Sequence, residues 1–367
     1  MNLLMLRPNT IDEVQTIVGQ HPRLHLRGRG SKPALSTPPG DAETLDLSGL
    51  SGVVEYNPGE YTFTAYAGTR IAVVQSMLDT HAQYLPFDPP LVEREATLGG
   101  TLAAGLSGPG RYRYGGVRDF ILGVRFVDGN AQVVRGGGKV VKNSAGFDIP
   151  KLMVGSLGQL GVLVELTFKV FPKAAAYTTL QLHCPALDEA VQALYQVYTA
   201  RLDVDSLDLV RGEDGSATLV VRLGGLPDAL PARAERIRAL LKGGEVVDDA
   251  EEAGVWRDAR EFAWVPSDWS LVKVPLTPGR IAQLDAALTL KCVPGSSQAR
   301  RRYSSGGNVA WVATPESPVA LDDALTSFGL SGLVVFGPAG QVRIGARNGQ
   351  AFERRVKEVF DPAKRFG

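Results

Sequence analysis

Arg27-Gly-Arg-Gly-Ser-Lys32 is the first glycine-containing loop of this 367-residue sequence and the one that says most about its fold. Residues 23–27 are strand-like and run directly into this series of small residues. A strand that enters a tight turn of this kind lets consecutive backbone N–H groups converge on an anion, as in a backbone nest. The natural guest is a pyrophosphate, and an ordinary glycine-rich turn is the alternative that this loop alone leaves open.

A second set of small residues, Ala96-Thr-Leu-Gly-Gly-Thr101, leads into the start of a helix. Such a start offers free N–H groups and the favourable end of a helix dipole, so two loops of this kind favour a dinucleotide ligand.

Two common nucleotide-binding glycine motifs, the Rossmann motif and the P-loop, are incomplete in this sequence. Pro33 stands where the Rossmann motif needs its third glycine, with no helix expected after it. Val140 follows Gly138-Lys139 where a P-loop needs Ser or Thr.

Composition excludes several classes of partner and site. The 39 basic and 39 acidic residues balance, and without a dense Lys/Arg run there is no electrostatic footprint for nucleic acid. Cys184 and Cys292 fit a reducing compartment and are too few to ligate an iron–sulfur cluster within the chain. Because neither a signal segment nor a run of about 18 apolar residues is present, the sequence predicts a cytoplasmic protein without a transmembrane segment.

Hydrophobic periodicity predicts helices and strands on both sides of a change in texture near residues 173–176. A capping box at residues 10–13 opens a helix, and Asp128-Gly129 marks the turn of a hairpin. Before the boundary we expect strands at 44–47, 52–56, 61–66, 121–127, 131–135 and 160–171, and a helix at 71–80. Beyond it we expect strands at 178–183 and 216–223 and helices at 188–200, 229–241 and from 277 onward, which together make an α+β unit.

Taken together, four blocks of the first half resemble the FAD-binding domain of the vanillyl-alcohol oxidase type flavoproteins. They are Arg27-Gly-Arg-Gly-Ser-Lys32, Ala96-Thr-Leu-Gly-Gly100, Arg113-Tyr-Gly-Gly-Val-Arg-Asp119 and Gly155-Ser-Leu-Gly-Gln-Leu-Gly161. The longer phrase Gly137-Gly-Lys-Val-Val-Lys-Asn-Ser-Ala-Gly-Phe-Asp148 is most similar to the FAD-binding subunits of bacterial glycolate oxidases. The resemblance implies an α+β fold, with a two-part PCMH-type FAD-binding domain at residues 1–172 and an α+β cap domain at residues 177–345. Residues 346–367 would return toward the FAD domain.

The resemblance also implies which residues contact FAD. Residues 27–32 would wrap the pyrophosphate through backbone amides (Arg27, Gly28, Arg29, Gly30, Ser31 and Lys32). Residues 97–101 would lie along the pyrophosphate and the flavin side (Thr97, Leu98, Gly99, Gly100 and Thr101). The main chain of a third loop would contact the adenine end (Gly158, Leu160, Gly161 and Val162).

A fourth block would close the cleft through Tyr114, Gly115 and Asp119, although Tyr114 as a core residue and Asp119 as a backbone cap are alternatives. The FAD would be bound non-covalently, because residues 27–32 contain no histidine and His25 is expected to be a strand residue.

The sequence identifies no catalytic residue and no metal site. Related 2-hydroxy acid dehydrogenases carry a histidine-rich, metal-binding motif in their second domain, whereas the last histidine of this chain is His183. Arg300-Arg-Arg302-Tyr303 could clamp a substrate carboxylate and relay a proton; a solvated basic turn is the alternative.

The resemblance therefore implies an FAD-binding subunit of a complex that oxidises a small 2-hydroxy acid, together with a catalytic flavoprotein subunit and an iron–sulfur subunit. Any association with the inner membrane would be through these partners. The alternatives are a stand-alone FAD-dependent 2-hydroxy acid or alcohol dehydrogenase, and a non-catalytic flavin-holding subunit.

Overall fold

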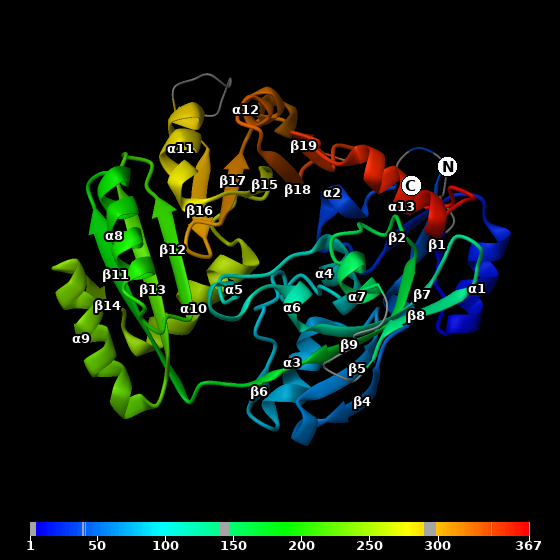
Figure 1. Cartoon of the computed structure of the whole chain (residues 1–367), viewed down its shortest axis with the longest axis horizontal. Helices are drawn as coiled ribbons and strands as arrows, with labels where there is room; N and C mark the ends of the chain where they lie inside the picture. Colours follow the sequence, from blue (N-terminus) through cyan, green and yellow to red (C-terminus); the bar gives the residue numbers. More distant parts are fainter. Residues whose placement is uncertain are drawn as a thin grey trace. The chain divides into compact units, whose positions relative to one another are not determined.

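The computed structural model describes residues 5–38, 40, 42–138, 147–289, 299–338 and 340–366, and the chain divides into two compact units (Figure 1). The first unit comprises Met1–Gly108, Gly115–Lys173 and Asn348–Gly367. The second unit comprises Pro109–Tyr114 and Ala174–Arg347. A short segment from within the first half of the sequence thus belongs to the second unit.

The first unit begins with a three-stranded parallel sheet in the order β1-β3-β2, formed by Met5–Leu6, Glu43–Asp46 and Leu24–Arg27. The predicted helix at its start is confirmed as α1 (Ile11–Gln20), because Thr10 Oγ1 accepts the Glu13 N–H at 3.2 Å. The expectation that no helix follows the first glycine loop was wrong. Pro33–Ser36 forms the short helix α2, where proline occupies a first-turn position that needs no N–H donor.

An antiparallel five-stranded sheet in the order β4-β5-β9-β7-β8 forms the rest of the first unit. Its strands are Val53–Asn57, Thr62–Tyr66, Val162–Lys169, Ile121–Val127 and Val133–Gly137, with α3 (Ile71–Asp79) between β5 and β6 in sequence. The predicted hairpin is confirmed, and Asp128 Oδ1 accepts N–H groups within its turn.

The strand expected at 160–171 is shorter than predicted. Phe171–Pro172 forms a separate strand, β10, which pairs with β6 (Gln83–Tyr84), since proline is tolerated in a short edge pair.

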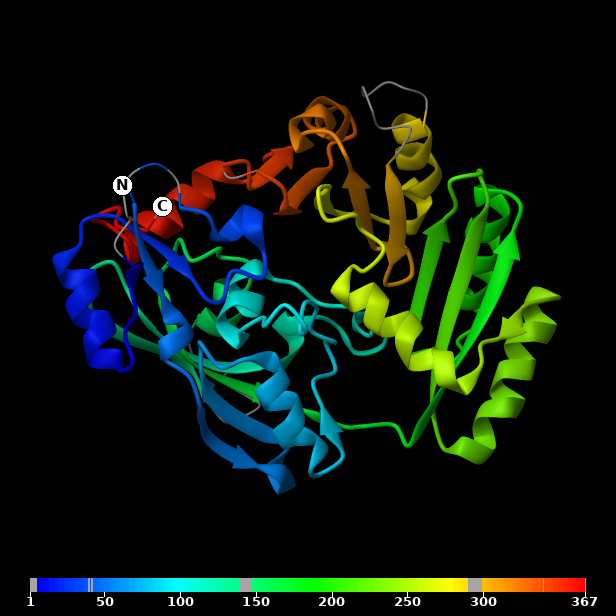
Figure 2. The same cartoon turned by 180° about the vertical axis from the view of Figure 1, so that it is seen from behind.

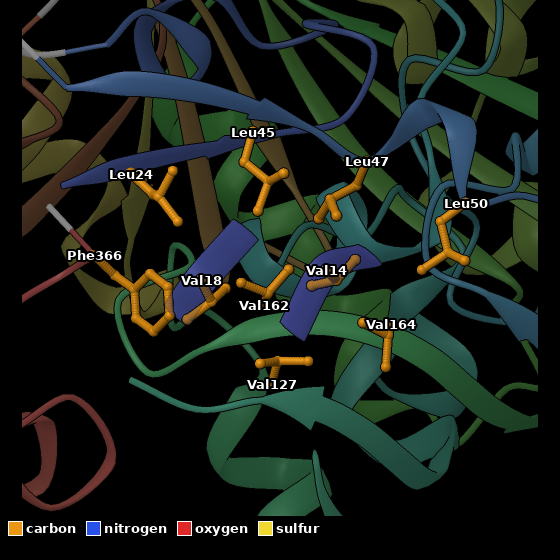
Figure 3. Packing of buried hydrophobic residues seen from close by; sticks show 10 residues of the cluster. All are labelled: Val14, Val18, Leu24, Leu45, Leu47, Leu50, Val127, Val162, Val164 and Phe366. Atoms are coloured by element: carbon orange, nitrogen blue, oxygen red, sulfur yellow. The ribbon is translucent and has the colours of Figure 1, made fainter. Parts of the chain in front are cut away.

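The core of the first unit joins segments that lie far apart in the sequence (Figure 3). Val14 and Val18 of α1 pack with Val162 of β9 and Leu24 of β2. Phe366, which follows α13 (Gln350–Phe360), belongs to the same cluster and is 1% exposed. The Leu24 N–H donates to the Arg365 carbonyl at 2.7 Å. The C-terminal segment therefore helps to hold the strand that leads into the first glycine loop.

The second unit contains one nine-stranded sheet in the order β14-β11-β13-β12-β16-β17-β15-β18-β19. In chain order the strands are β11 (Ala176–Cys184), β12 (Ser206–Arg211), β13 (Ala217–Gly225), β14 (Glu245–Val246), β15 (Ser270–Pro275), β16 (Arg300–Ser304), β17 (Val309–Thr314), β18 (Ser331–Phe336) and β19 (Arg343–Gly345). The helices are α8 (Leu187–Thr199), α9 (Leu230–Leu241), α10 (Asp249–Glu261), α11 (Ile281–Thr289) and α12 (Asp322–Ser327). Helices α8 and α11 cover one face of the sheet and α10 covers the other (Figures 1 and 2).

This sheet consists of two halves with the same order of elements. The segments β11-α8-β12-β13-α9-β14 and β15-α11-β16-β17-α12-β18 each follow the split βαβ pattern. They join where β12 pairs with β16, at Leu209 and Tyr303. The expected strands at 178–183 and 216–223 and helices at 188–200 and 229–241 are confirmed within this repeat, with small shifts at their ends. Within the described ranges, no helix combines the length and apolar character needed to cross a membrane.

Candidate cofactor-binding site

The first glycine loop connects β2 to α2 and presents a series of unused backbone donors. Among the described residues, none accepts a hydrogen bond from the backbone N–H groups of residues 28–32. Gly30 has φ +73°, a conformation that glycine adopts without steric cost, and Ser31 and Lys32 are buried. Because buried N–H groups are normally paired, this arrangement fits an oxygen-rich anion as the missing acceptor.

The second glycine loop lies directly against the first. Thr97 caps α4 (Leu98–Ala104) by accepting the Gly100 N–H at 3.2 Å. A Cβ at Gly28 would lie only 2.5 Å from Thr97 Oγ1, and a Cβ at Gly100 would lie 3.8 Å from the Lys32 ammonium nitrogen. Two segments about seventy residues apart in sequence therefore approach so closely that a glycine is required at the contact.

The expectation that the second loop offers free N–H groups was wrong. The Leu98 N–H donates to the Thr69 carbonyl at 2.9 Å, and the Gly99 N–H donates to the Ala67 carbonyl at 2.8 Å. The next two N–H groups, those of Gly100 and Thr101, donate to the side chain and the carbonyl of Thr97 respectively. The start of α4 is packed onto the residues that follow β5, which satisfy its donors. The buried Thr101 hydroxyl of α4 has no hydrogen-bond partner in the described structure.

The third glycine loop, residues 155–161, is anchored to the end of α4. The Gly155 N–H donates to the Leu102 carbonyl at 3.0 Å and the Leu157 N–H to the Ala103 carbonyl at 2.9 Å. A Cβ at Gly158 would lie 3.2 Å from Leu26, in the strand that precedes the first loop. All three loops thus pack against one another through α4 and β2.

The third loop also contains N–H groups that donate to no described residue. These are the backbone N–H groups of Gly158, Leu160 and Gly161. The side chain of Val162 is fully buried in the core, and its backbone pairs with Val127 in the sheet. A ligand beside this loop would therefore meet main-chain groups, and the contacts of this loop with the adenine end stay a prediction.

The fourth predicted block is divided between the two units. Tyr114 belongs to the second unit and is not among the residues that the first unit brings together. Asp119 Oδ2 accepts the Gly116 N–H at 2.8 Å at the start of α6 (Val117–Phe120). Asp119 thus caps the backbone, which is the alternative role given for it above. Gly115 has φ +98° and lies beside the Asp119 carboxylate. Within the longer phrase at residues 137–148, positions 139–146 lie outside the described residues.

Buried polar atoms without a described partner surround the loops. They are His25 Nε2 on β2, Arg27 Nε at the end of β2 and Thr101 Oγ1 on α4. Burial lowers the pKa of His25, and burial lowers the pKa of Lys32 to about 8. The described structure thus combines unpaired N–H donors, a hydroxyl and cationic side chains, which together suit the two phosphates and the polar rings of a flavin dinucleotide.

Strand β16 of the second unit contains the arginines for which the sequence suggested a carboxylate clamp or a solvated turn, and the structure gives them another role. Because residues of a strand alternate between faces, Arg301 and Arg302 point in opposite directions. Arg301 pairs with Asp285 at 2.8 Å, and Arg302 pairs with Asp208 at 2.7 Å. Because both pairs are buried, this strand is not a solvated turn. The two arginines bind different aspartates, so they do not form one contiguous clamp for a carboxylate.

Tyr303 is also engaged by an internal partner. Its hydroxyl donates to Asp285 Oδ1 at 3.0 Å, and burial together with that carboxylate raises its pKa well above the usual value. A phenol held in this way is a poor proton relay. Among the described residues, no group of three or more His, Cys, Asp or Glu side chains is arranged to hold a metal ion.

Comparison with known proteins identifies the family to which the chain belongs. Residues 3–137 match a family described as the FAD binding domain. The chain is 36% identical over 252 residues to glycolate oxidase subunit GlcE of Escherichia coli, covering 68% of this chain and 67% of that protein. The chain belongs to this family of FAD-binding oxidoreductases. The predictions of an FAD cofactor and of an α+β, PCMH-type fold are therefore confirmed.

Other members of this FAD-binding family are more distant. Glycolate oxidase subunit GlcD of Bacillus subtilis is 26% identical, covering 71% of this chain and 60% of its own length. D-2-hydroxyglutarate dehydrogenase of Xanthomonas citri is 23% identical, covering 87% and 66%. The chain thus spans about two thirds of the curated relatives. A solved alkyldihydroxyacetonephosphate synthase shares the fold with a TM-score of 0.76 at 15% identity, covering 98% of this chain and 74% of that one.

Proposed function

We propose that this chain is the FAD-binding subunit of a glycolate-oxidising complex, in which electrons from a 2-hydroxy acid pass to an iron–sulfur partner. The observation that carries the proposal is the packing of three glycine loops around unpaired N–H donors, in a chain that is 36% identical to a glycolate oxidase subunit. When bound, FAD would supply an isoalloxazine ring able to carry the two electrons that the hydroxy acid gives up in the complex. The chain supplies binding and orientation.

We assign the diphosphate to the first loop, whose N–H groups at residues 28–32 have no acceptor in the described structure. The adenosine side is assigned to the main chain of Gly158, Leu160 and Gly161. The flavin side is assigned to α4, where the buried Thr101 hydroxyl is unpaired. The first loop contains neither histidine nor cysteine, which supports non-covalent attachment.

The second unit supports a role within a complex rather than independent catalysis. Its Arg301, Arg302 and Tyr303 side chains are bonded to buried aspartates, and the sequence has no histidine after His183. Oxidation of a hydroxy acid needs a base for the hydroxyl proton and a cation for the carboxylate. We infer that a partner flavoprotein provides this machinery.

Anaerobic addition of glycolate to the FAD-loaded chain is expected to leave its flavin absorbance unchanged, whereas addition to the reconstituted complex bleaches it. The physical reason is that the candidate substrate-activating groups of the second unit, Arg301, Arg302 and Tyr303, are already bonded to buried aspartates. Bleaching of the isolated chain would favour a stand-alone dehydrogenase. A flavin that stays oxidised in the complete complex, but is bleached by dithionite, would favour a flavin-holding subunit and contradict the proposal.

A further inference from the structure

Lys32 is a buried cation without a counter-ion in the described structure. Its side chain is 5% exposed at the start of α2, and its ammonium donates to Ser31 Oγ at 3.1 Å. Among the described residues, no carboxylate forms an ion pair with it. The ammonium lies between the first and second glycine loops, because a Cβ at Gly100 would be 3.8 Å from it.

Lysine is almost never fully buried unless it is paired, since removing an ammonium from water is costly. The other cations of the same loop have different surroundings. Arg29 is exposed and pairs with Glu95 at 2.9 Å. Arg27 also lacks an ion pair among the described residues, but it is only partly buried and extends beside Gly30, with its Nη2 3.6 Å from the position of a Cβ there. Lys32 therefore retains an uncompensated charge at the point where the unused N–H groups of residues 28–32 gather.

We propose that the Lys32 ammonium is the counter-charge of the FAD diphosphate, so that this side chain, and not the backbone alone, determines the affinity for ligands that carry the diphosphate. The proposal rests on the family's FAD binding and is independent of whether the complex oxidises glycolate. In the free protein the unpaired ammonium costs stability. In the bound state the negative charge of the diphosphate compensates it. Substituting the lysine should then stabilise the free protein while it weakens the bound state.

The matched test compares Lys32→Met and Lys32→Gln with Lys173→Met in the full-length chain. Lys173 is an exposed lysine of the same unit, which pairs with Asp79. In titrations of the apoprotein, both Lys32 variants are expected to raise the Kd for FAD and for ADP by roughly 10- to 100-fold, the scale of a lost charge-assisted hydrogen bond. The Kd for adenosine, which lacks phosphates, should be unchanged. Lys173→Met should leave all three values unchanged.

Thermal unfolding of the same apoproteins gives a second readout. Lys32→Met is expected to raise the unfolding midpoint of the apoprotein, because it removes an unpaired buried charge. Unchanged FAD affinity in the Lys32 variants, or equal losses for ADP and adenosine, would overturn the proposal. A lowered midpoint would show that Lys32 has a structural partner in the free protein and would also contradict it.

The wild-type protein provides a test that needs no substitution. Burial lowers the pKa of Lys32 to about 8, so the free protein loses this charge as the pH rises through that value. Binding of the diphosphate then requires a proton, and the Kd for FAD is expected to rise up to about tenfold per pH unit above 8. Neither Lys32→Met nor adenosine binding should show this slope. A Kd for FAD that is flat from pH 7 to about 9.5 would contradict the role of the ammonium.

Discussion

Gly28→Val is expected to weaken FAD binding by at least about 100-fold, because the added side chain separates the first two glycine loops. A Cβ at this position already lies 2.5 Å from Thr97 Oγ1 and 3.3 Å from the Thr97 methyl group. Real Cβ atoms do not approach oxygen so closely, and Thr97 cannot withdraw because it caps α4. The loop must therefore move, and its N–H groups lose their common direction.

The measurement is FAD titration of the apoprotein, with Gly59→Ala as the control. Gly59 lies in the same unit, where a Cβ would have its nearest neighbour 3.6 Å away at Asn57 Oδ1. The control is expected to bind FAD as the unsubstituted chain does, with an unchanged circular dichroism spectrum. Full FAD affinity in Gly28→Val would show that the contact between the first and second loops is not needed for binding.

Asp208→Ala is expected to lower the free energy of unfolding by about 3–5 kcal/mol, as when one partner of a buried ion pair is removed. Asp208 is fully buried and accepts hydrogen bonds from Arg302 Nε at 2.7 Å and Ser304 Oγ at 2.8 Å. Its other oxygen accepts the Ser305 N–H at 3.1 Å. The substitution leaves a buried guanidinium, which already has an unpaired Nη2, without its carboxylate.

Denaturant unfolding of the apoprotein measures this effect, and the neighbouring residue Arg300 supplies the control. Arg300 pairs with Glu213 at 3.0 Å, but the side chain of Glu213 is 76% exposed. Glu213→Ala is therefore expected to cost no more than about 1 kcal/mol, as exposed pairs generally do. Similar losses for the two substitutions would mean that the ion pair at Asp208 is not buried as described.

The glycine loops could be found from the sequence because their pattern is local. A run such as residues 27–32 limits the backbone wherever it occurs, and its N–H groups remain unpaired in the described structure. The helix start at residue 98 could be predicted for the same reason. Its N–H groups could not be predicted to be occupied, because their acceptors at Ala67 and Thr69 are placed by tertiary packing.

The second unit shows where local reasoning stops. Residues 301–303 are polar in sequence, and their burial depends on Asp208 and Asp285, each distant along the chain. The strand β17 is buried along its whole length, so it lacks the alternation that identifies a half-exposed strand. The duplicated order of elements became visible only from the strand pairing.

The side-chain role proposed for Lys32 was also absent from the sequence prediction, which assigned contacts of the first loop to backbone amides. A lysine that ends a run of small residues without a neighbouring acid is a signal that could have suggested it. Burial of that lysine, however, depends on α4, about seventy residues further along the chain.

Amide hydrogen exchange of the full-length chain, with and without FAD, tests whether the first and third glycine loops bind the cofactor through unused N–H groups. We predict that exchange at residues 28–32, 158, 160 and 161 is fast in the apoprotein and strongly slowed when FAD is bound. Residues 98–101, whose N–H groups already have acceptors, should be protected in both states. Saturation with FAD that leaves exchange at residues 28–32, 158, 160 and 161 unchanged would contradict binding of the cofactor by these N–H groups.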